Sequence, residues 1–353
     1  MDCPEPSALA QAVWRATGTL ASARRHKVSA LLHLVPPEGL SADEAGGLRD
    51  DFRRTLAQNL IFLSHTQAVE QTLHEAGIAS LPLKGALFAS RFYPHLGARP
   101  QSDVDVLVYE RDLIGAHEAL LRAGWSEAAP RAFYVGHYHW VYREADTGCL
   151  LELHWRFKPS GTCAPDVDAV WRGASAGKVE GVRCLQMRPE DLLEYMAVNK
   201  AIQHYSTLLD LVDLFLIIEK SSLDWDYVVA SVRANHTAGA VWFGLSHAAA
   251  ILGARVPESA LRALAGSRAS IGARCLSRWL AKRGGPLAVR PELLEGPAGR
   301  VYEALLEGRC SGAARVFVPL LAPSQARLDV LAQGSYPRYV WNNLLRLCRQ
   351  LAV

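Results

Sequence analysis

Residues Leu83–Val108 read LKGALFASRFYPHLGARPQSDVDVLV, and the predicted fold of the chain rests on this segment. An apolar run ends at Lys84-Gly85, a short helix is expected next, and the alternating residues that follow predict a strand. Asp103 and Asp105 lie on the same face of that strand because successive side chains point to opposite faces. Two carboxylates side by side indicate a binding site for a cation.

A third acid, Glu152, lies in another strand-like segment, LLELHW at Leu150–Trp155. It stands between Leu151 and Leu153, where burying a carboxylate is costly unless it is paired or bound to a metal. Three acids on neighbouring strands would gather two divalent cations. Oxygen ligands indicate Mg²⁺, with Mn²⁺ as the alternative, and such an ion pair suits phosphoryl or nucleotidyl transfer.

The composition is that of an ordinary globular protein, with 353 residues, 50% hydrophobic and 21% charged. The formal net charge of +3 argues against a nucleic-acid partner. The seven cysteines are scattered and form no CxxC pair, which is typical of a reduced cytoplasm. The first residues lack the pattern of a signal peptide, and no window offers about 20 uninterrupted apolar residues. We therefore expect a cytoplasmic protein without a membrane span.

The sequence divides into three regions, which we predict to be domains. Residues 1–75 follow helical spacing and form an N-terminal helical region. Residues 76–187 contain strand-like segments between helices and form an α/β core. Residues 188–353 are helical almost without interruption and form a C-terminal all-helical domain. The predicted fold class is therefore α+β.

Local signals place individual elements within these regions. Ser41 and Glu44 match a capping box at the start of a long helix. A hairpin is expected to turn at Asp146-Thr147-Gly148, and a short strand is expected at Gly181–Gln186. The helices predicted in the last region begin near Pro189, Ser206, Asp226, Gly239, Pro257, Ser270, Gly299, Gly312 and Pro337.

This arrangement resembles the nucleotidyltransferase superfamily, the fold shared by polymerase-beta-like enzymes and kanamycin-type aminoglycoside nucleotidyltransferases. In that superfamily a Gly-Gly or Gly-Ser turn follows a strand, a D-x-D strand comes next, and a third acid lies on a further strand. Gly85, Asp103, Asp105 and Glu152 match this order. The resemblance implies a nucleotidyltransferase-like mixed-sheet core flanked by the two helical regions.

The chain is also similar, over roughly residues 60–220, to an uncharacterised bacterial nucleotidyltransferase family. Members of that family carry LKG, then R-P-x-x-D-x-D, then a strand with an acid followed by L-H-W. The matching positions are Leu83-Lys84-Gly85, Arg99-Pro100, Asp103, Asp105 and Glu152-Leu153-His154-Trp155.

The resemblance implies Mg²⁺-dependent transfer of a nucleotidyl group from an NTP, such as ATP, to a hydroxyl or phosphate of an unidentified small molecule or peptide. The residues expected to hold the metals and carry the catalysis are Asp103, Asp105 and Glu152. Those expected to bind the nucleotide phosphates are Lys84, Gly85, Arg99 and Ser102. Candidates for supporting positions around the site are His154, His204 and Asp213.

One residue departs from the superfamily pattern. Ala86 follows the glycine where a serine would hold the triphosphate, although the neighbouring Lys84 can bind a phosphate as a point charge. This departure leaves open a catalytically weak nucleotide-binding or interaction protein on the same fold. A metal-dependent phosphohydrolase and a nucleic-acid end-modifying enzyme are further alternatives.

Histidines near Glu152 allow a second interpretation of the metal chemistry. His154 shares a strand face with Glu152, and His137 and His139 share one face of the preceding strand. A histidine–carboxylate site for a transition metal such as zinc can be drawn from these residues. A strand histidine is more often a packing or hydrogen-bonding group, so both interpretations stay open.

Overall fold

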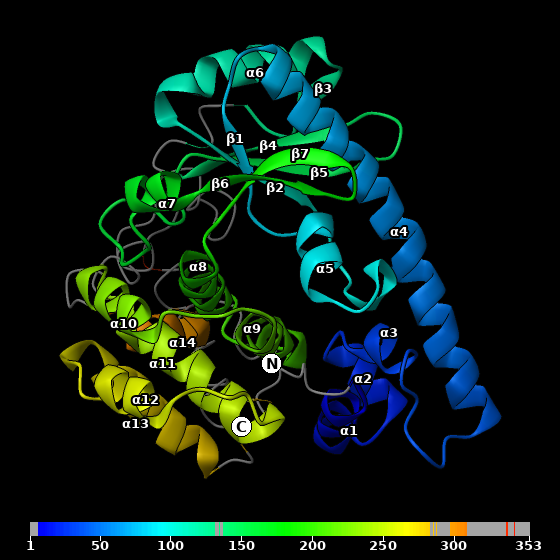
Figure 1. Cartoon of the computed structure of the whole chain (residues 1–353), viewed down its shortest axis with the longest axis vertical. Coiled ribbons are helices and arrows are strands. Elements are labelled where there is room, and N and C mark those ends of the chain that lie inside the picture. Colours follow the sequence, from blue (N-terminus) through cyan, green and yellow to red (C-terminus); the bar gives the residue numbers. More distant parts are fainter. Residues whose placement is uncertain are drawn as a thin grey trace.

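The computed structural model describes residues 6–130, 134, 137–282, 285, 287, 297–308, 337 and 342. Within them a sheet with covering helices forms one part of the molecule, and a bundle of helices forms the other (Figure 1). The mixed sheet and the many helices confirm the predicted α+β class. The helices predicted at Gly312–Leu321 and Pro337–Leu351 lie outside the described residues, apart from positions 337 and 342.

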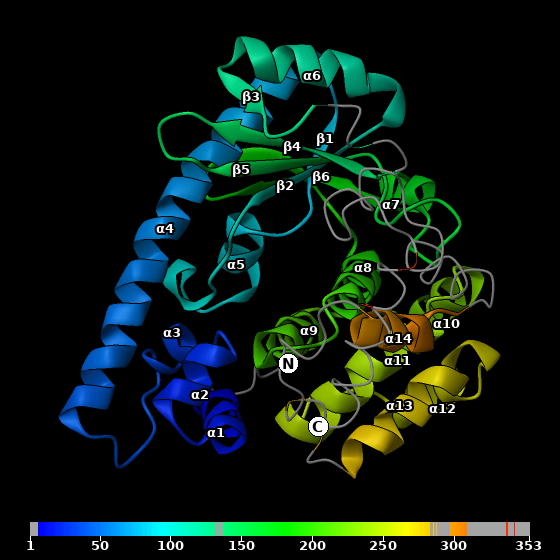
Figure 2. The same ribbon diagram turned by 180° about the vertical axis from the view of Figure 1, so that it is seen from behind.

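A long helix, α4 (Ala42–Glu75), runs along one side of the molecule and connects its N-terminal helices to the sheet (Figures 1 and 2). The predicted capping box at its start is confirmed, because the Glu44 N–H donates to Ser41 Oγ (3.2 Å) and the Ser41 N–H donates to Glu44 Oε2 (3.0 Å). Its 34 residues span about 50 Å. The preceding helices are α1 (Pro6–Thr17), α2 (Leu20–Arg25) and α3 (Ser29–Leu32).

The main sheet has five strands in the order β1-β2-β5-β4-β3. Only β2 and β5 pair in parallel, and their neighbours pair antiparallel, so the sheet is mixed. The predicted hairpin is confirmed as β4 and β5. The five strands are β1 (Ser80–Pro82), β2 (Val104–Val108), β3 (Trp125–Glu127), β4 (His139–Glu144) and β5 (Leu150–His154).

A separate two-stranded sheet contains one strand that the sequence predicted and one that it did not. The expected strand at Gly181–Gln186 is β7 (Val182–Gln186), and its partner is β6 (Ser175–Val179). The helices between the strands are α5 (Ala86–Phe92), α6 (Leu113–Arg122) and α7 (Val167–Gly173).

The two faces of the main sheet have different chemistry. Val104, Val106, Val108, Leu151 and Leu153 point to one face and form a buried cluster with α4 and α6. The alternate positions of β2 and β5 therefore point to the other face, toward α5 and the C-terminal helices (Figure 2). This second face carries the acids singled out in the sequence.

Among the described residues after 188, the chain is mainly helical, as predicted. Helix α9 (Leu208–Lys220) is buried almost along its full length, and it packs between α5 and the helices α8 and α11. No helix of the described residues combines the length and the apolar character needed to cross a membrane. The helices are α8 (Pro189–Ile202), α9 (Leu208–Lys220), α10 (Trp225–Ala234), α11 (Ala238–His247), α12 (Glu258–Ala265), α13 (Ile271–Ala281) and α14 (Pro297–Leu306).

A buried carboxyl between α4 and β1 makes the stability depend on pH. Glu70 is 5% exposed and accepts a hydrogen bond from Ser80 Oγ (3.0 Å), and its burial raises its pKa to about 7. The unfolded chain releases this proton near pH 4.5, so the folded state loses stability as the pH rises from there through 7. The glutamine variant carries no such proton. As the pH rises from 4 to 9, we therefore expect the difference in free energy of unfolding between Glu70→Gln and the wild type to change by about 3 kcal/mol in favour of the variant.

Urea denaturation across this pH range measures the difference. Glu75→Gln is the matched control, because Glu75 is exposed on the same helix, and its stability should follow the wild type at each pH. Parallel curves for Glu70→Gln and the wild type would contradict the raised pKa.

Candidate active site

The register of the strands brings the predicted acids together. Asp105 of β2 lies directly opposite Glu152 of β5, and Asp103, two residues earlier, points to the same face. Their carboxylate oxygens lie within 4.8 Å of one another. The Asp105 side chain is fully buried, whereas those of Asp103 and Glu152 are 20% and 28% exposed. The group therefore forms a half-open set of oxygen donors suited to a hard divalent cation.

Lys84 fills the space between two of these acids. Its Nζ lies 3.2 Å from Asp105 Oδ2 and 3.7 Å from Asp103 Oδ1. Burial alone would lower the pKa of Lys84, but the carboxylates of Asp105 and Asp103 outweigh burial and raise it. The predicted phosphate ligand is therefore a cation held by the acid cluster itself.

The two aspartates differ in protonation because their surroundings differ. Burial, followed by repulsion from Asp105, raises the pKa of Asp103 to about 6. Burial acts in the same direction on Asp105, but Lys84 and His154 outweigh it and hold the pKa of Asp105 well below its usual range. Asp105 is therefore the stronger acid of the pair.

His154 supports the acids from β5. Its Nε2 lies 3.1 Å from Glu152 Oε2 and 3.3 Å from Asp105 Oδ1. Burial opposes a charge on this ring, but the hydrogen bonds to the two carboxylates outweigh burial and raise the pKa of His154. Across the strands His139 lies opposite, and burial together with His154 lowers the pKa of His139 to about 4.

Arg99 and Asp213, which the sequence placed near the site, bind each other. The Arg99 guanidinium donates from Nε (2.8 Å) and Nη2 (2.9 Å) to the two oxygens of Asp213 on α9. Asp213 also accepts from the Tyr93 hydroxyl (2.6 Å) and lies 3.0 Å from Lys200 Nζ. All of these side chains are buried. The network ties the loop before β2 to helices α8 and α9.

A cleft of about 430 Å³ opens between the acid cluster and these helices. Gly85 borders it with φ of 83°, and a Cβ there would lie 3.2 Å from Gln101 Oε1, so this position favours glycine. All four predicted phosphate ligands, Lys84, Gly85, Arg99 and Ser102, line this cleft together with Asp103. The other lining residues are Lys27, Pro100, Gln101, Lys200, Gln203, Ser206, Thr207, Leu209 and Asp210.

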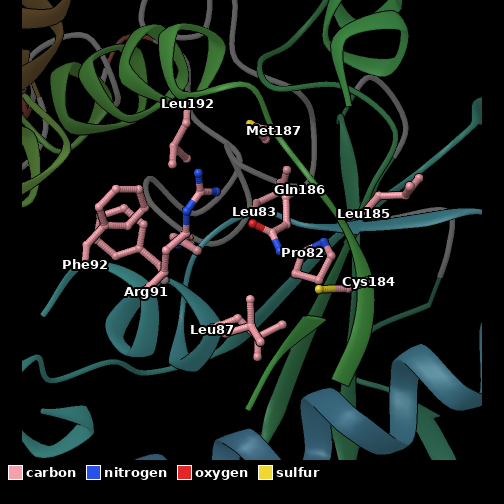
Figure 3. Close-up of a pocket in the computed structure, with 13 residues that line it drawn as sticks. Pro82, Leu83, Leu87, Arg91, Phe92, Cys184, Leu185, Gln186, Met187 and Leu192 are labelled. Carbon is pink, nitrogen blue, oxygen red and sulfur yellow. The ribbon is translucent and has the colours of Figure 1, made fainter. Parts of the chain in front are cut away.

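A smaller hollow, with Lys84 among its lining residues, lies between α5, β1, the β6–β7 pair and α8 (Figure 3). Its walls are mainly apolar, and the side chain of Arg91 lies among them. The volume is about 40 Å³, which holds a few water molecules. The cleft beside the acids, in contrast, has room for a nucleotide.

Two further positions singled out in the sequence pack against other parts of the protein. The His204 ring packs edge-on against Tyr302 of α14, with centroids 5.6 Å apart. Ala86 is 1% exposed at the first turn of α5, so its methyl group faces the protein interior. Sequence reasoning missed Lys200 in the cleft wall, although a single cation in the apolar run of α8 was the available signal.

The chain matches a family of known proteins. A family model described as "Uncharacterised nucleotidyltransferase" matches residues 14–253. The chain belongs to this family. The predicted membership of a nucleotidyltransferase family is thus confirmed, and it supports nucleotidyl transfer as the general activity.

Two other comparisons complete this finding. No curated protein matches the chain significantly. A solved structure similar to it is the crystal structure of an antigenic nucleotidyltransferase-like protein from Paracoccidioides brasiliensis, with 15% identity and a TM-score of 0.36. The similarity covers 57% of this chain and 95% of that one.

Proposed function

We propose that this member of the nucleotidyltransferase family transfers a nucleotidyl group from an NTP to a hydroxyl or phosphate of an acceptor, using two Mg²⁺ ions. The supporting observation is the acid cluster, with its donor oxygens within 4.8 Å of one another, at the edge of a cleft of about 430 Å³. Three carboxylates, two of them partly exposed, fit hydrated Mg²⁺, which keeps several of its water ligands.

In this proposal Asp103, Asp105 and Glu152 hold the ions. When bound, the ions polarise the phosphates and lower the pKa of an attacking hydroxyl. Glu152, whose side chain is 28% exposed, completes the ion site or accepts the proton of the acceptor hydroxyl. His154 fixes the orientation of Glu152 and Asp105 through its hydrogen bonds to both. Lys84 turns its ammonium from the acids to the anionic triphosphate.

The proposed division of labour follows the three regions of the sequence. Residues 76–187 supply the metal and phosphate chemistry, while residues 188–353 and the β4–β5 hairpin select the acceptor. We propose ATP as a donor and the cytoplasm as the setting. The free cysteines Cys149, Cys163, Cys184 and Cys275 support a reducing compartment.

Pyrophosphate release tests the proposed reaction. The full chain is incubated with each α-labelled NTP and a panel of hydroxyl and phosphate acceptors, with Mg²⁺, with Mn²⁺ or with EDTA. We expect pyrophosphate release and label transfer that depend on the metal and stop with EDTA. Without a metal cation, the anionic carboxylates and the anionic triphosphate repel each other.

Other products would identify the alternatives. Calorimetric NTP binding without pyrophosphate release would favour a catalytically weak binding protein, the alternative motivated by Ala86. Metal-dependent release of inorganic phosphate without label transfer would favour a phosphohydrolase.

A further inference from the structure

A second group of metal-binding side chains lies beside the acid cluster. His139 of β4 is the direct register partner of His154 of β5, and Glu152 precedes His154 by two residues on the same face. One ligand atom from each of these residues lies within 4.8 Å of the other two. Two strands of one hairpin thus present two imidazoles and one carboxylate to a common point.

Both histidine rings have a nitrogen that makes no hydrogen bond within the described residues. The His139 and His154 rings lie 5.0 Å apart between centroids, and each keeps a buried Nδ1 without a hydrogen-bond partner among the described residues. His154 is only 5% exposed. Buried ring nitrogens normally have partners, so two unpartnered ones on facing residues call for a ligand.

We propose that His139, His154 and Glu152 bind a divalent transition-metal ion of the Zn²⁺ or Co²⁺ type. Imidazole nitrogen suits such ions, whereas Mg²⁺ prefers oxygen ligands throughout. Three protein ligands leave a coordination position for water, as in open zinc sites. Donors bound at about 2.1 Å lie about 3.4 Å apart in a tetrahedral site, so small side-chain rotations close the group.

The surroundings suit an ion of this kind. The Tyr138 ring lies 4.7 Å from the His139 ring and 5.9 Å from the His154 ring, which provides one wall. The Glu152 side chain is 28% exposed, so solvent and ions reach the group. Binding here requires no nucleotide and does not depend on the proposed transfer activity.

The chain provides variants that separate this site from the acid cluster. Glu152 belongs to both groups, whereas His139 belongs only to the histidine group and Asp103 only to the acid cluster. Removing the nitrogen ligand of His139 should therefore change the affinity for a transition metal alone. His137, in the same segment and with its ring 6.1 Å from that of His139, is the matched control.

Metal binding to the chelator-treated full chain, without nucleotide, tests the proposal. Zn²⁺ affinity is measured by competition with a chromophoric chelator, and Co²⁺ coordination by its visible absorption. We expect one tight Zn²⁺ per chain, a loss of affinity of about 100-fold in His139→Ala, and changes within about threefold in His137→Ala and Asp103→Asn. His139→Asp restores a ligand and should recover at least about tenfold over His139→Ala.

Three results would overturn the proposal. The first is the absence of a tight Zn²⁺ in the wild type. The second is wild-type affinity in His139→Ala, and the third is a loss in Asp103→Asn that equals the loss in His139→Ala, which would assign the ion to the acids. Circular dichroism of each variant verifies folding, and the recovery in His139→Asp keeps the test decisive if the alanine variant is unstable.

Discussion

Replacing Asp105 with asparagine is expected to reduce the proposed Mg²⁺-dependent nucleotidyl transfer by about a thousandfold or more, equivalent to about 4 kcal/mol in the activation barrier. Asp105 lies between Lys84, His154 and Glu152, and its side chain is fully buried. An amide keeps the shape of the side chain but removes the charge that holds the cations in the proposed mechanism. Pyrophosphate release at saturating NTP and Mg²⁺ measures the loss.

Stability separates the two aspartates. The sequence pattern alone predicts that removing either acid relieves repulsion and leaves stability unchanged or raised. The structure retains this prediction for Asp103, but Asp105→Asn removes the nearest partner of the buried Lys84 ammonium, so we expect it to be the less stable variant. Thermal unfolding compares the two.

Asp50→Asn, an exposed position on α4, is the control for both measurements and should match the wild type. Full activity in Asp105→Asn would contradict the metal-binding role. A lower melting temperature for Asp103→Asn than for Asp105→Asn would contradict the assignment of Lys84 to Asp105.

Replacing Asp213 with asparagine is expected to lower the free energy of unfolding by about 3–5 kcal/mol. Asp213 is fully buried. It forms ion pairs with Arg99 and Lys200 and accepts a hydrogen bond from the Tyr93 hydroxyl. Removing its charge leaves the buried Arg99 guanidinium without its ion-pair partner, and leaves the buried Lys200 ammonium with Asp210 (3.1 Å) in place of two acids. Chemical denaturation of the full chain measures the loss.

Tyr93→Phe provides a graded comparison within the same network. It removes one hydrogen bond to Asp213 and no charge, so its cost should be about 1–2 kcal/mol. An Asp213→Asn variant within 1 kcal/mol of the wild type, or equal losses in the two variants, would show that the paired charges add little.

Much of the core could be predicted because its signals are local. The alternation in SDVDVLV places Asp103 and Asp105 on one face, and β2 forms as expected. The strand β6 was missed because its sequence, SAGKV, has small residues and no apolar alternation, and it is held by pairing with β7. The parallel pairing of β2 with β5 is equally non-local.

Long-range partners also limited the prediction of the site. The family resemblance implies a phosphate-binding role for Arg99, and the sequence does not reveal that its guanidinium binds Asp213, 114 positions later in the chain. The sequence of α9 shows only an acid in an apolar helix, which does not name the partner. The same limit applies to Lys84, whose contact with the acids depends on how β1 and β2 pair.

The position of Lys84 bears on how the site is filled before each reaction. Because its ammonium already lies against Asp103 and Asp105, a divalent ion that binds these acids would have to displace an internal counter-ion. The attraction between the ion and the carboxylates would then be offset by the loss of the contacts between Lys84 and these carboxylates. Mg²⁺ that arrives without a nucleotide would therefore gain little binding free energy. An ion carried in by a triphosphate also supplies the anion that the released ammonium contacts. We therefore expect a divalent metal and a nucleotide to enter the proposed site as a single species.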